Sequence, residues 1–94
     1  MTDPTPEIAK MWVLSTSHLR SSTCNEWLAY KCHWSCVPKG EYGWFMYVPD
    51  EIGFYPDVPH ELVVIIHLAR AISAEWVMFD CDGPTYDGLV VHNW

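Results

Sequence analysis

Three carboxylates gather near the end of the chain, where Asp80, Asp82 and Asp87 flank a glycine- and proline-containing segment. Oxygen ligands clustered at a turn suit Mg²⁺ or Ca²⁺. No calcium-loop pattern is present, and aspartate followed by Gly-Pro is also what a tight connection requires. The sequence therefore favours solvated carboxylates beside a turn. A small metal-dependent enzyme that uses Asp80 and Asp82 is the alternative.

The segment 79–85, which contains Asp80 and Asp82, is similar to the nucleophile motif of haloacid-dehalogenase-type phosphatases. In that family two carboxylates at the end of a strand attack phosphate and hold magnesium. The family's motif ends its first strand and precedes a long α/β domain, whereas only nine residues follow Thr85. We also expect no cation nearby to stabilise a transferring phosphoryl group. The sequence therefore predicts no catalytic residue, no bound metal and no cofactor.

A second cluster contains the ligand atoms for one tetrahedral zinc: Cys24, Cys32, His33 and Cys36, with His18 as a further candidate. Its spacing differs from that of paired zinc knuckles, and free thiols are the simpler interpretation. A metal protein that uses Cys24, Cys32 and Cys36 stays open as an alternative. Because the first residues lack the features of an export signal, we expect reduced thiols and a cytoplasmic location.

The elements that would position these side chains alternate between strands and helices. Hydrophobic periodicity and turn signals predict strands at 11–14, 42–48, 75–80 and 89–92, and helices at 23–31 and 59–72. This order, β-α-β-α-β-β, predicts an α/β (α+β) fold, a two-layer sandwich in which a four-stranded mixed sheet carries two helices on one face. We expect residues 1–10 to form a flexible tail and residues 11–94 a single globular domain.

Several local features sharpen this prediction. The connection from the second strand to the third contains a helix, which favours a parallel crossover, and the last two strands should form an antiparallel hairpin. Thr23 and Glu26 have the spacing of a capping box at the start of the first helix. The second helix carries an apolar stripe of Leu62, Ile65, Ile66, Ala69 and Ile72.

The second predicted strand is apolar on both faces. Its residues divide into Tyr42, Trp44, Met46 and Val48 on one side and Phe45 and Tyr47 on the other. Two helices cover only one face of the sheet, so one aromatic patch is left for self-association, for a protein partner, or for cover by a tail. A homodimeric accessory protein joined through this strand is therefore a further alternative.

The charge balance restricts the partners. Five Lys and Arg against twelve Asp and Glu give a net charge of −7 over 94 residues, which disfavours direct contact with a phosphate backbone. The longest apolar run, 62–66, is too short to span a membrane. Excess negative charge speeds encounter with basic clefts, although it also serves solubility. Acidic residues and neighbouring rings form the predicted partner-binding surface: Asp50, Glu51, Phe54, Tyr55, Asp57, Asp80, Asp82, Tyr86 and Asp87.

Four stretches taken together, 14–18, 40–49, 76–84 and Trp94, resemble an uncharacterised family of small proteins from bacterial phages, plasmids and integrated elements. The likeness covers most of residues 11–94 and is most specific in the glycine-aromatic run 40–49. The family brings no agreed catalytic residues. It implies a context in which small acidic proteins from mobile elements often disable host defence nucleases or regulate the element itself. We therefore expect an anti-CRISPR or anti-restriction inhibitor whose acidic surface mimics nucleic acid and occupies the basic channel of a host protein or nucleoprotein complex.

Overall fold

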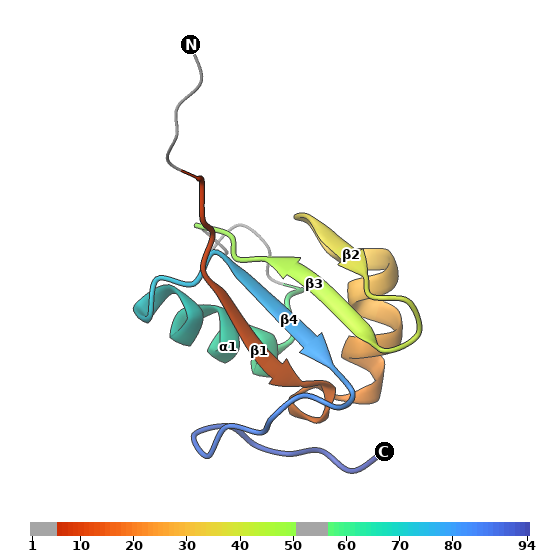
Figure 1. Cartoon of the computed structure of the whole chain (residues 1–94). Helices are drawn as coiled ribbons and strands as arrows, with labels where there is room; N and C mark the ends of the chain where they lie inside the picture. Colours follow the sequence, from red (N-terminus) through yellow and green to blue (C-terminus); the bar gives the residue numbers. More distant parts are fainter. Residues whose placement is uncertain (1–5, 51–56) are drawn as a thin grey trace.

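The computed structural model describes residues 6–50 and 57–94, and Figure 1 shows their arrangement. Its strands are β1 (Met11–Ser15), β2 (Cys36–Pro38), β3 (Gly43–Tyr47) and β4 (Trp76–Asp80). Its helical elements are the 3₁₀ turn η1 (Thr16–His18), the π-helix η2 (Thr23–Lys31) and the α-helix α1 (His60–Ala71). The protein is a mixed α+β fold that contains a four-stranded mixed sheet and two helices of more than one turn.

The strands lie in the order β1-β4-β3-β2. β4 pairs in parallel with β1 and antiparallel with β3, and β2 pairs antiparallel with β3. The predicted parallel pairing of strands 42–48 and 75–80 is therefore wrong. The sequence prediction also missed β2, which forms a hairpin with β3 at the edge of the sheet. The predicted element order changes accordingly to β1-η1-η2-β2-β3-α1-β4.

The predicted fourth strand at 89–92 does not form. Backbone groups of the C-terminal segment bind the corner that follows β1 instead of extending a sheet ladder. The Ser15 N–H donates to the Pro84 carbonyl at 2.8 Å, and the His92 N–H donates to the Ser17 carbonyl at 2.7 Å. These bonds direct the segment across the end of the sheet, so the predicted hairpin with strand 75–80 is wrong as well.

The first helix begins differently from the predicted capping box. Thr23 Oγ1 donates to Glu61 Oε2 at 2.7 Å, and the Arg20 N–H donates to the same oxygen at 3.0 Å. Glu61 lies in the first turn of α1. A carboxylate from α1 therefore serves the start of η2 in place of Glu26, which the sequence prediction had assigned to this role.

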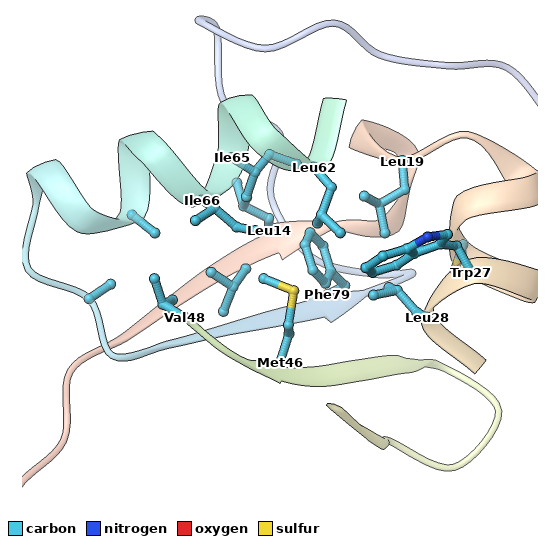
Figure 2. Packing of buried hydrophobic residues seen from close by; sticks show 14 residues of the cluster. Leu14, Leu19, Trp27, Leu28, Met46, Val48, Leu62, Ile65, Ile66 and Phe79 are labelled. Atoms are coloured by element: carbon cyan, nitrogen blue, oxygen red, sulfur yellow. The ribbon is translucent and has the colours of Figure 1, made fainter. Parts of the chain in front are cut away.

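The apolar stripe of α1 is buried as predicted. Its fully buried members are Leu62, Ile65, Ile66 and Ala69. Figure 2 shows Leu62, Ile65 and Ile66 between α1 and the strands, with Trp27 and Leu28 completing the cluster from η2. Ile72, which the sequence assigned to the same stripe, follows the last residue of α1 and is 43% exposed.

The strands contribute one face to this core. Leu14, Met46, Val77 and Phe79 are each at most 1% exposed, and they alternate with side chains that point to the opposite side of the sheet. Among the helices of the described residues, none combines the length and apolarity that a membrane span requires.

Candidate functional site

The sheet side opposite the core is also apolar, and we call it the outer face. Its members are Met11, Val13, Val37, Phe45, Tyr47, Trp76 and Met78. One row of side chains crosses all four strands in register. Val13 pairs with Met78, and Met78 pairs with Phe45. Phe45 then pairs with Val37 on β2. Hydrophobic side chains are therefore continuous from one edge of the sheet to the other.

Part of the outer face is open to solvent. Val37 is 54% exposed, Met11 42% and Tyr47 39%. The Tyr47 and Trp76 rings meet edge to face with centroids 5.4 Å apart. In Figure 1, α1 and η2 lie behind the sheet, and no described helix crosses its front. The strand 42–48 was predicted to be apolar on both faces. The face with Phe45 and Tyr47 is the one that no described helix covers.

Carboxylates stand at both ends of the two central strands. Glu41 and Asp50 flank β3, while Glu75 and Asp82 flank β4, and all four are exposed. We call these four residues the acidic rim. The apolar outer face is thus bordered by negative charge at the strand ends.

Asp80 ends β4 on the same side of the sheet as the outer face. Its Oδ1 accepts from the Asp82 N–H at 2.9 Å, and its Oδ2 lies 3.0 Å from Lys39 Nζ. The Asp82 N–H and then the Lys39 ammonium lower the pKa of Asp80. The expectation that no cation lies near this carboxylate is therefore wrong. Both oxygens of Asp80 have partners, and the arrangement is that of a turn closed by an ion pair.

Asp80, Cys81 and Asp82 form the only described group that brings three potential ligand atoms within 4.8 Å of one another. Cys81 and Asp82 are exposed. Since the Asp80 carboxylate is already bound by Lys39 and the Asp82 N–H, the group offers a cation few unoccupied oxygens. Its geometry gives the metal alternative no specific support.

Asp57 connects the segment before α1 to η2. Its carboxylate lies 2.9 Å from His33 Nε2 and accepts from Trp27 Nε1 at 3.2 Å. The His33 imidazole, followed by the Trp27 N–H, lowers the pKa of this carboxyl. Asp57 was predicted to contact a partner, but these bonds give it an internal role in holding two segments together.

The other predicted partner-binding residues differ in their surroundings. Asp50, Asp82 and Asp87 are exposed. Tyr86 is 46% exposed, yet its ring packs edge to face on Trp12 with centroids 5.5 Å apart. Glu51, Phe54 and Tyr55 lie outside the described residues. The predicted surface is thus divided between exposed carboxylates and side chains that the fold itself uses.

Sequence reasoning missed a buried histidine that anchors the C-terminal segment. His18 is 1% exposed, and its Nδ1 lies 2.9 Å from the Val90 carbonyl oxygen. Its Nε2 accepts from the Tyr86 N–H at 2.8 Å. The ring is therefore neutral with its proton on Nδ1, because a carbonyl only accepts and an amide N–H only donates. Local sequence patterns could not predict this contact, because His18 and Val90 are 72 positions apart in the chain.

The four cysteines are free thiols: Cys24 is buried, Cys32 and Cys36 are half-buried, and Cys81 is exposed. The two histidines considered with them are oriented elsewhere, since His33 binds Asp57 and both ring nitrogens of His18 have partners. The predicted cysteine and histidine ligands therefore do not converge on one centre.

A groove of about 560 Å³ lies at the carboxyl ends of β1 and β4. Residues from five parts of the chain line it, among them Ser17, Trp44, Cys81, His92 and Trp94. Two of its rings are fixed by backbone carbonyls, since Trp44 Nε1 donates to Cys24 and Trp94 Nε1 to Leu19, both at 2.9 Å. Sequence reasoning could not identify this groove, because the fold alone brings its lining residues together.

Comparison with known proteins gives a family but no function. Searches of curated proteins and of solved structures returned no match. The model described as "Family of unknown function (DUF5983) C-terminal domain" matches residues 11–94. That range includes every strand and helix described above. The chain therefore belongs to the DUF5983 family of unknown function, through its C-terminal domain.

Proposed function

We propose that this domain acts by binding another protein and catalyses no reaction. The observation that carries the proposal is the apolar outer face, which crosses all four strands and is half-exposed at Met11, Val37 and Tyr47. Soluble domains seldom expose a continuous apolar patch unless it contacts something. A sheet face with rigid aromatic side chains is a suitable centre for such an interface.

The charges around the outer face indicate the chemistry of the partner. The acidic rim places an exposed carboxylate at each end of β3 and β4. The two lysines nearest the strands are engaged, since Lys39 pairs with Asp80 and Lys10 donates to the Ile72 carbonyl. The remaining cations are Arg20, Lys31 and Arg70, which belong to the helical side of the molecule. An apolar patch surrounded by Lys and Arg would complement this surface.

Basic groups around apolar or aromatic side chains are typical of the channels in which proteins bind nucleic acid. We therefore propose that the domain inhibits a bacterial nucleic-acid-binding protein by occupying its binding site, as an anti-CRISPR or anti-restriction protein of a mobile element would. The net charge of −7 supports this proposal. The exposed Asp50, Asp82 and Asp87 would stand where phosphates normally lie. The apolar outer face would supply most of the binding free energy, with the acidic rim contributing to specificity.

The test uses the immobilised chain and a bacterial lysate freed of nucleic acid by nuclease treatment. We expect recovery of proteins that added duplex DNA and added salt both release, identified by mass spectrometry. Val37→Lys with Tyr47→Lys should lower recovery by about tenfold or more, because a charge enters the apolar centre. Asp82→Lys with Asp87→Lys should weaken it and reduce its salt dependence.

Tyr30→Lys is the matched control, since Tyr30 is 85% exposed on η2, outside the outer face. Asp80 is left intact in these binding variants because its bonds to Lys39 and to the Asp82 N–H belong to the fold. Unchanged recovery with the outer-face pair would overturn the proposal. A dimer at micromolar concentration by light scattering, lost in the outer-face pair, would instead identify a second copy as the occupant. Metal-dependent hydrolysis of a phosphate ester, abolished by Asp80→Asn, would establish the enzyme alternative.

A further inference from the structure

Three aromatic side chains from separate parts of the chain line the groove at the carboxyl ends of β1 and β4. Trp44 belongs to β3, Tyr42 precedes that strand, and Trp94 lies at the end of the C-terminal segment. The indole Nε1 atoms of Trp44 and Trp94 already donate to the backbone carbonyls of Cys24 and Leu19. These two rings therefore offer the groove their apolar carbon and π-electron surface, and no free N–H donor.

Backbone bonds hold the segment that carries Tyr42 against the turn that follows β4. The Cys81 N–H donates to the Tyr42 carbonyl at 2.8 Å, and the Tyr42 N–H donates to the Lys39 carbonyl at 3.0 Å. Gly43, the next residue, lies so close to β4 that a Cβ there would stand 1.6 Å from the Phe79 carbonyl oxygen. The backbone that carries the Tyr42 ring is thus fixed before any ligand arrives, which lowers the ordering cost of binding.

The ionised Glu41 gives the groove a negative charge. Among the described residues that line it, Glu41 has the only carboxylate, and there is no Lys or Arg. Lys39 Nζ lies 5.8 Å from the centroid of the Tyr42 ring, and its charge is balanced by Asp80 Oδ2 at 3.0 Å. A phosphate or carboxylate ligand would meet neither a lysine nor an arginine in this lining. A positive ligand would be attracted by Glu41 and by the net charge of −7.

We propose that the groove is a binding site for an organic cation, such as the quaternary ammonium group of choline or the guanidinium of an arginine side chain. Aromatic faces attract such weakly hydrated cations, and the carboxylate adds to the attraction. A groove of about 560 Å³ holds a cation of this size together with the group that it is attached to. The site does not depend on the protein partner proposed for the outer face.

The test uses the purified full chain and two probes of the same shape. Choline and its uncharged isostere, in which a tert-butyl group replaces the trimethylammonium group, are titrated at constant ionic strength. Tryptophan fluorescence and calorimetry record binding. We expect saturable binding of choline, with the isostere at least about tenfold weaker, because only the cation is attracted by the rings and by Glu41. A blocked arginine, N-acetylarginine amide, is the third probe, and tighter binding than choline would identify an arginine side chain as the preferred cation.

Variants at exposed positions separate the ring from the charge. Tyr42→Leu removes a ring that is 57% exposed and should weaken choline binding by about tenfold, whereas Tyr42→Phe should stay within about twofold. Glu41→Gln should weaken choline binding and leave the isostere unchanged. Glu75→Gln is the matched control, because it removes the same charge at the other end of β4 and should leave choline binding within about twofold. Circular dichroism verifies the folding of each variant.

Three outcomes would overturn the proposal. One is equal binding of choline and its uncharged isostere, and another is choline binding that survives both Tyr42→Leu and Glu41→Gln unchanged. The third is the absence of saturable binding for choline and for the blocked arginine alike. Because the assay contains no other macromolecule, these outcomes are distinct from a failure of the outer face to capture a protein.

Discussion

The two faces of the sheet are both apolar, but they differ in how much of their surface other elements cover. On the core side Leu14, Val77 and Phe79 are at most 1% exposed, because α1 and η2 pack on them. On the outer face Val13 and Met78 alternate with those residues along β1 and β4, and Phe45 lies beside Met78 on β3. They cover one another but lie under no described helix. The comparison teaches that apolar alternation alone does not identify the core, because cover by other elements decides which face is buried.

The polar groups of the two sides differ in the same way. On the covered side, buried His18 and half-buried Glu61 each accept or donate hydrogen bonds that join segments distant in sequence. At the border of the outer face Lys39 and Asp80 form an ion pair, and surface ion pairs contribute little to stability. The covered side therefore determines the stability of the domain, which leaves the outer face available for an interaction.

The largest expected effect is the loss of core packing. Phe79→Ala should lower the free energy of unfolding by about 3 to 5 kcal/mol, because it leaves a cavity among fully buried side chains. The matched change on the other face, Phe45→Ala, should cost only about 1 kcal/mol because its side chain is partly exposed. Urea denaturation of both variants measures the difference. Equal losses would show that the outer face is covered as well as the core side is.

The next effect concerns the histidine that holds the C-terminal segment. His18→Leu should cost about 1 to 3 kcal/mol, because the Tyr86 N–H and the Val90 carbonyl both lose their partner. Amide hydrogen exchange should accelerate across residues 84–92 while protection in β3 and β4 changes little. His18→Asn, which retains a side-chain amide, should recover part of the loss. Unchanged exchange at Tyr86 would show that the segment is held by other contacts.

The smallest effect is a pH dependence at Glu61. Burial opposes its ionisation, but the Arg20 N–H and the Thr23 hydroxyl together lower the pKa below its ordinary 4.5. A carboxyl whose pKa is lower in the folded state stabilises the fold above its ordinary pKa, and this contribution is lost as the pH falls. Glu61→Gln should therefore be less stable at pH 7, by about 1 kcal/mol or less given solvent screening. The gap should close between pH 4.5 and lower values in parallel urea titrations, and a gap that widens there would contradict the assignment.

Local sequence patterns predicted much of the sheet and both long helices, of which the helix 23–31 is the π-helix η2. The strands 11–14, 42–48 and 75–80 and the helix 59–72 were found within a few residues, because each has a strong hydrophobic period and clear turn residues at its ends. β2 was missed because it has three residues and ends in a proline. The strand prediction at 89–92 was wrong. Its β-branched residues fit the local pattern of a strand, but backbone groups of this segment bind Ser17 and His18 at the corner after β1.

The candidate site was less accessible to sequence reasoning. The number of predicted helices indicated an uncovered aromatic patch, and the charge balance indicated an acidic surface. The exposed Asp50, Asp82 and Asp87 agree with the predicted acidic surface. The internal partners of Asp57 and Asp80 could not be predicted, because His33 and Lys39 reach them through the fold.

By itself the sequence determined the approximate positions of β1, β3, β4 and the two long helices, the net negative charge, and the excess of apolar surface over what two helices cover. These properties depend on residue type and short spacings, which the chain carries locally. The tertiary structure alone decided strand order, the direction of β3 relative to β4, the path of the C-terminal segment and the face left open. Those features depend on hydrogen bonds and packing between residues far apart in the chain, such as His18 with Val90 and Thr23 with Glu61.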